Sequence, residues 1–528
     1  MKTKQVVLDG QHLTIQDIQN IVTDKSVSVR LSPSVATQTK KAEQFIQKSL
    51  DHKIIYGVNT GFGPMASHII GREEVIQLQV NLIRSHAMGM GEPIAPEYVL
   101  AAMVVRLNTL AKGYSGISYD LLKRLELFIN KRIIPVVPEH GAVGTSGDLV
   151  QLAHIALALI GEGEVWYAGK RHATSSILRD LHIGAYTLKP KEGLALINGT
   201  SVMTGIAALF AVHAERLLNL SVELGSLALE LVHGFNDGIS EKLHGLRPHP
   251  GQVAVAAQMR KILTSSKLLR PRTLLQETFT VTEETHEIPE DVQEVYSLRC
   301  IPQVLGPVHD ALQKAKKEIE TEMNSVTDNP VVDWPNKAFL HGGNFHGDYI
   351  ATTVDHLKMT LVKLTLLNER RINFFLSARL NRRFPPFMNL KIPGLTLGLQ
   401  GLQFVATSTA AQNQTYAYPH SVHSIPTNGD NQDIVSMGTD AALIAMKVVQ
   451  NAYVVLAIEL ITLAQGVDFA DEKRKLSEKT RVLYDALRKI LPVVVDDRVL
   501  IKELPNVEEF VKTSSLIDLE WGSGRKKK

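Results

Sequence analysis

The stretch MTGIAALFAVHAERLLNLSVELGSLALELV, residues 203–232, decides the fold class of this chain. Its apolar residues recur at spacings of three and four almost without gaps, which is the periodicity of a helix with a wide buried face. The helix it predicts is much longer than the globular average of about 11–12 residues. Long helices with wide apolar faces pack against one another, so we expect a central helix bundle. The same pattern recurs at 306–324, 350–377, 398–416 and 434–466.

The part of the chain before residue 200 has a mixed pattern. Two-residue turns containing glycine predict hairpins at 6–15, around Asp9-Gly10, and at 164–173, around Ala168-Gly169. Residues 330–340 are a third hairpin candidate. Helical patterns lie between these stretches, at 74–87, 96–112, 118–131 and 148–160.

These patterns predict a mainly α protein. We expect a smaller mixed N-terminal domain over residues 1–200 and the long-helix bundle over residues 201–466. Residues 467–528 are charged and have shorter apolar runs, which is typical of a peripheral helical segment, here with a basic tail.

Composition excludes several classes of protein. Of the 528 residues, 44% are hydrophobic and 21% charged, as in ordinary soluble globular proteins. The net charge of +3 is too small to indicate nucleic-acid binding. Charged and polar side chains interrupt the longest apolar stretch, 433–469, so it predicts buried helix and no membrane span. Cys300 is the only cysteine, and residues 1–17 have no secretory signal, so we expect a cytoplasmic protein.

The stretch GAVGTSGDLVQLAH, residues 141–154, places a polar, glycine-rich corner between two apolar runs. A serine hydrolase needs Gly-x-Ser-x-Gly around its nucleophile, but Asp148 stands where the last glycine should be. The simplest structural interpretation is that Asp148 or Ser146 caps the helix that follows. A serine hydrolase stays open as an alternative, which an active-serine probe would reveal.

Further motifs accompany this corner along the chain. They are YGVNTGFGP (56–64), ALINGTSVMTG (195–205), YSLRCIPQVLGP (296–307), TDNPVV (327–332), HGGNFHGDY (341–349) and HSIPTNGDNQDIVSMG (423–438). Their order, from Tyr56 to about residue 465, resembles the aromatic amino acid ammonia-lyase and aminomutase family. In NLIRSH, LINGTSVMTGI, YSLRC and GGNFHGDYI the chain is similar to Flavobacterium-type bacterial tyrosine ammonia-lyases.

The resemblance implies an ammonia-lyase/fumarase-like fold and a homotetramer whose active sites are shared between subunits. It also implies a cofactor, because in the family the segment at Thr145-Ser146-Gly147 cyclises autocatalytically, with the loss of two waters, to 4-methylideneimidazol-5-one (MIO), and no metal takes part. Gly147 lets its nitrogen approach the carbonyl of residue 145, and Ser146 supplies the hydroxyl that is eliminated. Thr145 replaces the usual alanine, and only its side chain hangs off the ring.

The resemblance implies roles for individual residues as well. Tyr56 matches the base that removes the β-proton of a substrate whose amine has added to the MIO. Arg299 matches the residue that pairs with the substrate carboxylate, which suits a planar guanidinium. Other positions around the MIO and the substrate are matched by Asn198, Tyr296, Gln432, Gln293 and Phe345.

Two further positions bear on which amino acid is the substrate. The pair Ser85-His86 matches a selectivity position, where a histidine can hydrogen-bond a phenol or an imidazole. Gln412 stands where histidine ammonia-lyases typically carry glutamate. Together they predict a carbon–nitrogen lyase that converts L-tyrosine to p-coumarate, with L-phenylalanine to cinnamate as the secondary reaction.

Other functions remain open. Histidine ammonia-lyase, forming urocanate, is the runner-up, and an aromatic 2,3-aminomutase shares the fold. A relative that never forms MIO is a third alternative, against which the intact Ser146 and Tyr56 argue. The partner expected in each catalytic case is a small aromatic amino acid, with no nucleic acid and no membrane.

Overall fold

The computed structural model describes residues 4–279, 284–285, 287–288 and 291–521. The chain divides into two compact units, each assembled from three separate segments. The three consecutive parts predicted above are a different division, which stays a prediction. Unit 1 consists of Met1–Val212, Ala315–His356 and Pro419–Ala445, and unit 2 of His213–Lys314, Leu357–Tyr418 and Met446–Lys528.

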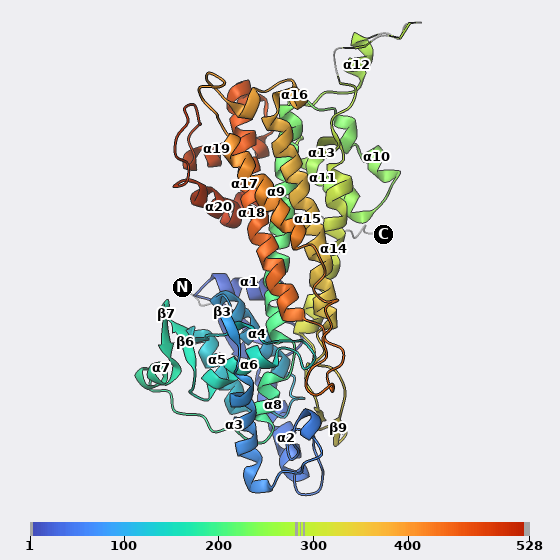
Figure 1. Cartoon of the computed structure of the whole chain (residues 1–528). Helices are drawn as coiled ribbons and strands as arrows, with labels where there is room; N and C mark the ends of the chain where they lie inside the picture. The colour runs from blue at the N-terminus through green and yellow to red at the C-terminus, as the bar shows by residue number, and fades with distance from the viewer. Residues whose placement is uncertain (1–3, 280–283, 286, 289–290, 522–528) are drawn as a thin grey trace. The chain divides into compact units, whose positions relative to one another are not determined.

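The predicted mainly α fold with long helices is confirmed (Figure 1). Two described helices, α9 and α18, are long and apolar enough to cross a membrane, but 78% and 67% of their most apolar windows are buried. That burial is typical of core helices in a bundle. All but α17 of the long helices have residues in both units. The long helices are α9 (Ser201–Leu231), α14 (Ile301–Met323), α15 (Asp348–Leu376), α17 (Gln400–Thr415) and α18 (Gly438–Ala470).

Buried polar contacts join the long helices within unit 2. Arg371 of α15 pairs with Glu459 of α18, and both side chains are fully buried. Asn413 of α17 donates to the carbonyl of Val448 in α18 at 3.1 Å. Removing one partner of a buried ion pair typically costs about 3–5 kcal/mol, so such contacts specify which helix faces meet.

His213 of α9 is a buried group whose contribution to stability depends on pH. Its Nδ1 lies 3.0 Å from the hydroxyl of Tyr453 in α18. Burial, with the nearby charges of Lys512 and Arg216, lowers the pKa of His213 to about 4. In the unfolded chain a histidine has a pKa near 6.5, so below this pH the unfolded chain binds a proton that the folded chain does not. The free energy that the neutral His213 contributes to folding is therefore complete above pH 6.5 and is lost as the pH falls towards 4.

We therefore expect the free energy of unfolding to fall by up to about 3 kcal/mol more in the wild type than in His213→Gln between pH 7 and pH 4. Glutamine keeps a polar partner for the hydroxyl of Tyr453 but does not titrate. Denaturant unfolding of both proteins at the two pH values measures the difference. An equal loss in the two proteins would show that His213 is not the source.

Unit 1 contains the predicted shorter helices and two of the three predicted hairpins. β6 pairs with β7, and β8 with β9, each in antiparallel register. The helix bounds agree with the predicted ones to within a residue. They are α3 (Val75–His86), α4 (Pro96–Ala111), α5 (Tyr119–Lys131) and α6 (Leu149–Leu159), and the strands are β6 (Glu164–Tyr167), β7 (Lys170–Ala173), β8 (Val331–Asp333) and β9 (Ala338–Leu340).

The hairpin predicted at residues 6–15 is wrong. β1 (Gln5–Leu8) pairs in parallel with β2 (Ser28–Leu31), and α1 (Ile15–Thr23) connects them. Gly10 does turn the chain, with φ of 87°, but the next residues start a helix. Thr14 and Asp17 cap that helix reciprocally, each side chain accepting from the other's backbone N–H. This capping box was the local signal that outweighed the Asp-Gly turn.

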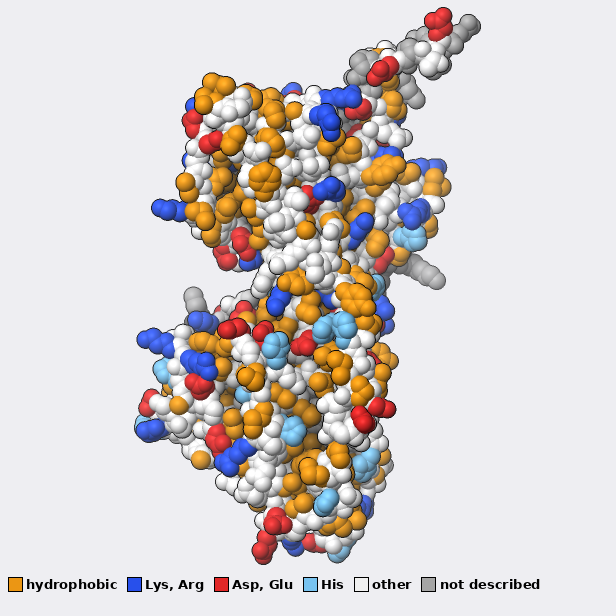
Figure 2. Space-filling view, in the orientation of Figure 1, with side chains coloured by type: hydrophobic (Ala, Val, Ile, Leu, Met, Phe, Trp, Pro, Cys, Tyr) orange, Lys and Arg blue, Asp and Glu red, His pale blue; other side chains and the backbone are white. Residues whose placement is uncertain are grey.

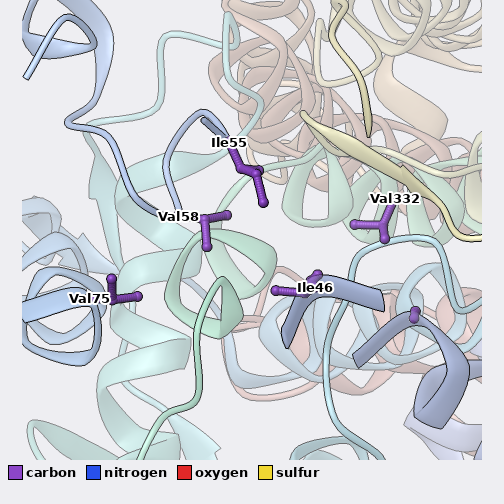
Figure 3. Close-up of a cluster of buried hydrophobic side chains, with 6 residues drawn as sticks. Ile46, Ile55, Val58, Val75 and Val332 are labelled. Atoms are coloured by element: carbon purple, nitrogen blue, oxygen red, sulfur yellow. The ribbon is translucent and has the colours of Figure 1, made fainter. Parts of the chain in front are cut away.

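A buried apolar cluster fixes the loop that carries Tyr56. Ile55 and Val58, on either side of it in sequence, are both fully buried. They belong to one cluster with Ile46 of α2 (Pro33–Ser49), Val75 of α3 and Val332 of β8 (Figure 3). Burying an aliphatic side chain stabilises a fold by about 1.5–3 kcal/mol, so this cluster determines the path of the loop.

The range 467–528, where a peripheral helical segment is predicted, contains α19 (Glu478–Ile490) and α20 (Leu504–Thr513). On the face shown in Figure 2, basic and acidic side chains are interspersed with apolar ones.

The other described α-helices are short or peripheral. They are α7 (Thr174–Asp180), α8 (Glu192–Ile197), α10 (Glu241–Gly245), α11 (Pro250–Ile262), α12 (Thr273–Thr278), α13 (Tyr296–Arg299) and α16 (Ala378–Asn381).

Candidate active site

Unit 1 contains a cavity of about 700 Å³ where segments far apart in the sequence meet. The Tyr56 loop, the end of α3, the glycine-rich corner and the loop over residues 427–434 all contribute to its wall. Most of the residues predicted for the site therefore line this one cavity. The predicted residues that line the cavity are Tyr56, His86, Thr145, Ser146, Gly147, Asn198, Phe345 and Gln432.

The corner has a backbone that only glycine can adopt at position 147. Gly147 has φ of 67°, and a Cβ there would lie 1.9 Å from the carbonyl oxygen of Gly199. Gly199 is tied to both neighbours of Gly147: its N–H donates to Ser146 O at 3.2 Å, and its carbonyl accepts from the Asp148 N–H at 2.8 Å. A side chain at position 147 would therefore break this pairing.

The same pairing leaves two groups of the corner free. Among the described residues, neither the N–H of Gly147 nor the C=O of Thr145 has a hydrogen-bond partner. The preceding carbonyls are held, because Val143 O accepts from the Met437 N–H and Gly144 O accepts from the Gly347 N–H, each at 3.0 Å. The groups that cyclisation would join are thus free within a clamped loop, and the corner fits MIO formation.

Asp148 connects the corner to the starts of three helices. It occupies the N-cap position of α6, but its side chain makes no hydrogen bond to that helix. Its fully buried carboxylate accepts from the N–H groups of Val202 and Met203 in α9 and from the hydroxyl of Thr439 in α18. Of the two residues expected to cap this helix, Asp148 or Ser146, Asp148 does stand at the N-cap, but no side-chain hydrogen bond caps the helix.

Three helix N-termini, those of α6, α9 and α18, thus converge beside the corner. Helix N-termini carry partial positive charge and favour negative charge nearby. Burial raises the pKa of Asp148 to about 6 despite the hydrogen bonds it accepts. At neutral pH the carboxylate is therefore ionised and offsets part of this positive potential.

Asn198 is oriented by a buried ion pair that the sequence did not reveal. Its amide nitrogen donates to Asp328 Oδ1 and to the carbonyl of Asn329, each at 3.1 Å. The other carboxylate oxygen of Asp328 accepts from Lys191 Nζ at 2.7 Å, and this pair is fully buried. Both amide hydrogens of Asn198 are thereby used, so its carbonyl oxygen is what it offers to the cavity.

Arg106 of α4 supports the same region. It is almost fully buried, and its guanidinium donates to the carbonyls of Leu196 and Asn198 at 3.2 and 2.7 Å. Burial lowers the pKa of Arg106 to about 10. Asp328 lies in the TDNPVV motif, whereas Arg106 and Lys191 lie in no recognisable motif, so the sequence indicated only one of the three residues.

Tyr56 reaches the cavity from the loop fixed by the apolar cluster. Its phenol oxygen accepts a hydrogen bond from the N–H of Gly63 at 3.1 Å. The ring meets the ring of Phe62 edge-on, with centroids 6.3 Å apart. These two contacts restrict the positions of the phenol oxygen and of the ring.

His86 at the end of α3 has a defined tautomer in its neutral form. Its Nδ1 lies 2.9 Å from the carbonyl oxygen of Leu82, which can only accept, so Nδ1 carries the hydrogen. Nε2 then has a free lone pair and acts as an acceptor. Ser85 does not line the cavity; its hydroxyl donates to the same Leu82 carbonyl at 3.1 Å and lies 3.1 Å from Nδ1 of His86.

The remaining predicted residues, Gln293, Tyr296, Arg299 and Gln412, belong to unit 2 and are not among the lining residues. The guanidinium of Arg299 lies 4.7 Å from the ring centroid of Tyr296, whose side chain is exposed. The amide oxygen of Gln412 accepts from Asn451 at 2.9 Å. Over the described residues, we find no group of three or more His, Cys, Asp or Glu arranged to hold a metal ion.

Comparison with known proteins identifies the family. The sequence pattern of the family described as aromatic amino acid lyase matches residues 13–489. The chain belongs to the aromatic amino acid lyase family. It is therefore a carbon–nitrogen lyase, as predicted from the order of its motifs.

Relatives in the aromatic amino acid lyase family extend over nearly the whole chain. Histidine ammonia-lyase of Geobacillus thermodenitrificans is 40% identical over 97% of this chain and 98% of its own. Among solved structures, tyrosine aminomutase from Streptomyces globisporus is similar with a TM-score of 0.94 and 35% identity, covering 98% of this chain and 100% of the other. Histidine ammonia-lyase from Trypanosoma cruzi is also similar, with a TM-score of 0.87 and 32% identity. The match covers 97% of this chain and 94% of the other.

Proposed function

We propose that this protein eliminates ammonia from an aromatic L-amino acid, with L-tyrosine as the preferred substrate and p-coumarate as the product. The proposal includes an MIO group formed from Thr145-Ser146-Gly147. The observation that carries it is the corner itself, where the Gly147 N–H and the Thr145 C=O are free while the backbone around them is held. Once formed, the MIO supplies an electrophilic carbon for the amine of the substrate.

The chain's own residues supply the remaining chemistry on this proposal. Tyr56 takes the β-proton, because it is the phenol that the cavity presents on a fixed loop. Three helix N-termini lie beside the corner, and the part of their positive potential that the Asp148 carboxylate does not offset favours negative charge there. Asn198 offers a carbonyl oxygen, which can accept a hydrogen bond from the amine.

The carboxylate of the substrate needs a cation that this cavity does not supply. Among the described lining residues there is no arginine and no lysine. We propose that Arg299 of a neighbouring subunit provides it, together with Tyr296, Gln293 and Gln412, in a homotetramer. The proposal also includes a cytoplasmic location and a small amino acid as the substrate.

His86 supports the choice of substrate. Its Nε2 is an acceptor, and the cavity wall near α3 is apolar, with Leu82, Leu149 and Val150. An aromatic ring with a hydrogen-bond donor satisfies this lone pair, and a plain phenyl ring leaves it unpaired. A phenol and an imidazole both qualify, so L-histidine is the second candidate, which the histidine ammonia-lyase relatives favour. The neutral Gln412 favours the phenol, because it lacks the charge that would hold an imidazole.

The test is to incubate the purified protein separately with L-tyrosine, L-phenylalanine and L-histidine and to follow the ultraviolet absorbance of the conjugated acid. We expect coumarate to form fastest. In His86→Phe, kcat/KM for L-tyrosine should fall about 10- to 100-fold, because a buried donor loses its acceptor, and L-phenylalanine should lose much less.

Each other outcome points to a different function. Urocanate forming fastest would identify the second candidate. Accumulation of a β-amino acid, seen by chromatography, would identify an aminomutase. No product from any of the three substrates, in a protein whose mass shows that two waters have been lost, would contradict the proposed substrates.

A further inference from the structure

Thr145 makes a contact that the alanine usual at this position could not make. Its hydroxyl donates to the amide oxygen of Gln432 at 2.6 Å, and Thr145 as a whole residue is 4% exposed. The amide nitrogen of Gln432 in turn donates to the hydroxyl of Ser146 at 3.3 Å. Because the hydroxyl of Thr145 binds the oxygen end of the amide, the nitrogen end faces Ser146.

Gln432 is also an inward anchor of its loop, beside Ile434, whose carbonyl oxygen lies 3.2 Å from Nε2 of His346. Every residue from Val422 to Ile434 is exposed except Gln432. The tip of this loop is tight, with positive φ at Asn428 and Asp430, and the backbones of Thr427 and Gln432 pair with each other at 3.0 and 3.2 Å. Within residues 427–433 the backbone bonds are thus internal, and the side chain of Gln432 connects the tip to the corner.

We infer that Thr145 is a positioning residue whose hydroxyl holds the amide of Gln432 and thereby holds the loop over residues 427–434 against the corner. This inference rests on the proposed function for its kinetic consequence, but the contact itself does not. The hydroxyl of Thr145 persists after cyclisation, whereas that of Ser146 is lost. The NH2 group of Gln432, which faces the Ser146 hydroxyl here, would then lie beside the carbon that carried this hydroxyl.

The variant that removes only the donor is Thr145→Val, which keeps the shape of the side chain. Hydrogen exchange of the segment 427–434, followed by mass spectrometry, should be about fivefold faster in Thr145→Val than in the wild type, as expected for one lost hydrogen bond. Thr145→Ser keeps the hydroxyl and should stay within about twofold of the wild type. Exchange in Gln432→Ala should already be fast, and adding Thr145→Val should not increase it further.

Kinetics give the second readout. In Thr145→Val, kcat should fall about fivefold, and the protein mass should still show the loss of two waters. Thr145→Ser should have a kcat close to that of the wild type. Three outcomes would each overturn the inference. They are unchanged hydrogen exchange in Thr145→Val, independent effects of Thr145→Val and Gln432→Ala in the double variant, and failure of Thr145→Val to lose two waters. Hydrogen exchange is measured without substrate. An inactive wild type would therefore contradict the proposed function, whereas the exchange experiment would still test the role of Thr145.

Discussion

Ser146→Ala protein should retain its full translated mass and produce no conjugated acid from any aromatic amino acid. Alanine has no hydroxyl to eliminate, so the ring cannot acquire its electrophilic carbon. The fold should survive, because Ser146 contacts the rest of the chain mainly through its backbone carbonyl, which accepts from Gly199, and through Gln432. Intact-mass measurement of wild type and variant, beside the ultraviolet assay, tests both parts of the expectation.

A matched control separates loss of chemistry from loss of fold. Ser26 is an exposed serine outside the cavity, and Ser26→Ala should keep the processed mass and the wild-type rate. Gly147→Ala should also stay unprocessed, but with a disturbed fold, because its Cβ would collide with the carbonyl of Gly199. Product formation by Ser146→Ala at the wild-type rate would contradict the MIO proposal and reopen other chemistry at the corner.

The sequence revealed those parts of the fold that depend on local periodicity. The long helices and the two short hairpins in unit 1 were predicted because their patterns need no knowledge of distant partners. The hairpin predicted at residues 6–15 is wrong because β1 pairs with β2 beyond α1, and because the Thr14–Asp17 capping box starts a helix where a second strand was expected. Parallel pairing of this kind depends on tertiary packing, which local turn signals do not report.

For the site, motifs identified the residues that touch the cavity, but not those that orient them. Ser146, Gly147 and Tyr56 lie in recognisable sequence motifs, and all three line the same cavity. The Lys191–Asp328 pair behind Asn198 joins residues 137 positions apart, and no local pattern indicates such a pairing. Likewise, Asp148 was expected to cap the adjacent helix, and its true partners became visible only when α9 and α18 met it in space.

Tyr56→Phe should lower kcat by about 10²- to 10⁴-fold, the range typical for removal of a general base, while leaving MIO formation intact. The substitution removes one oxygen and keeps the ring, so the edge-on contact with Phe62 and the burial of Ile55 and Val58 persist. The N–H of Gly63 loses its acceptor but lies at a cavity where water can replace it. The variant's mass should therefore show the loss of two waters, as in the wild type.

The division of the effect between kcat and KM distinguishes a base from a packing residue. A group that acts only in proton transfer leaves KM nearly unchanged, whereas a misplaced loop weakens substrate binding and raises KM. Tyr349→Phe, at an exposed tyrosine that does not line the cavity, provides the matched control and should keep both constants. If Tyr56→Phe kept its kcat within about twofold of the wild type, the proton would be taken by another group. His86 and His346 are the lining residues to test next, because each has an imidazole that can accept it.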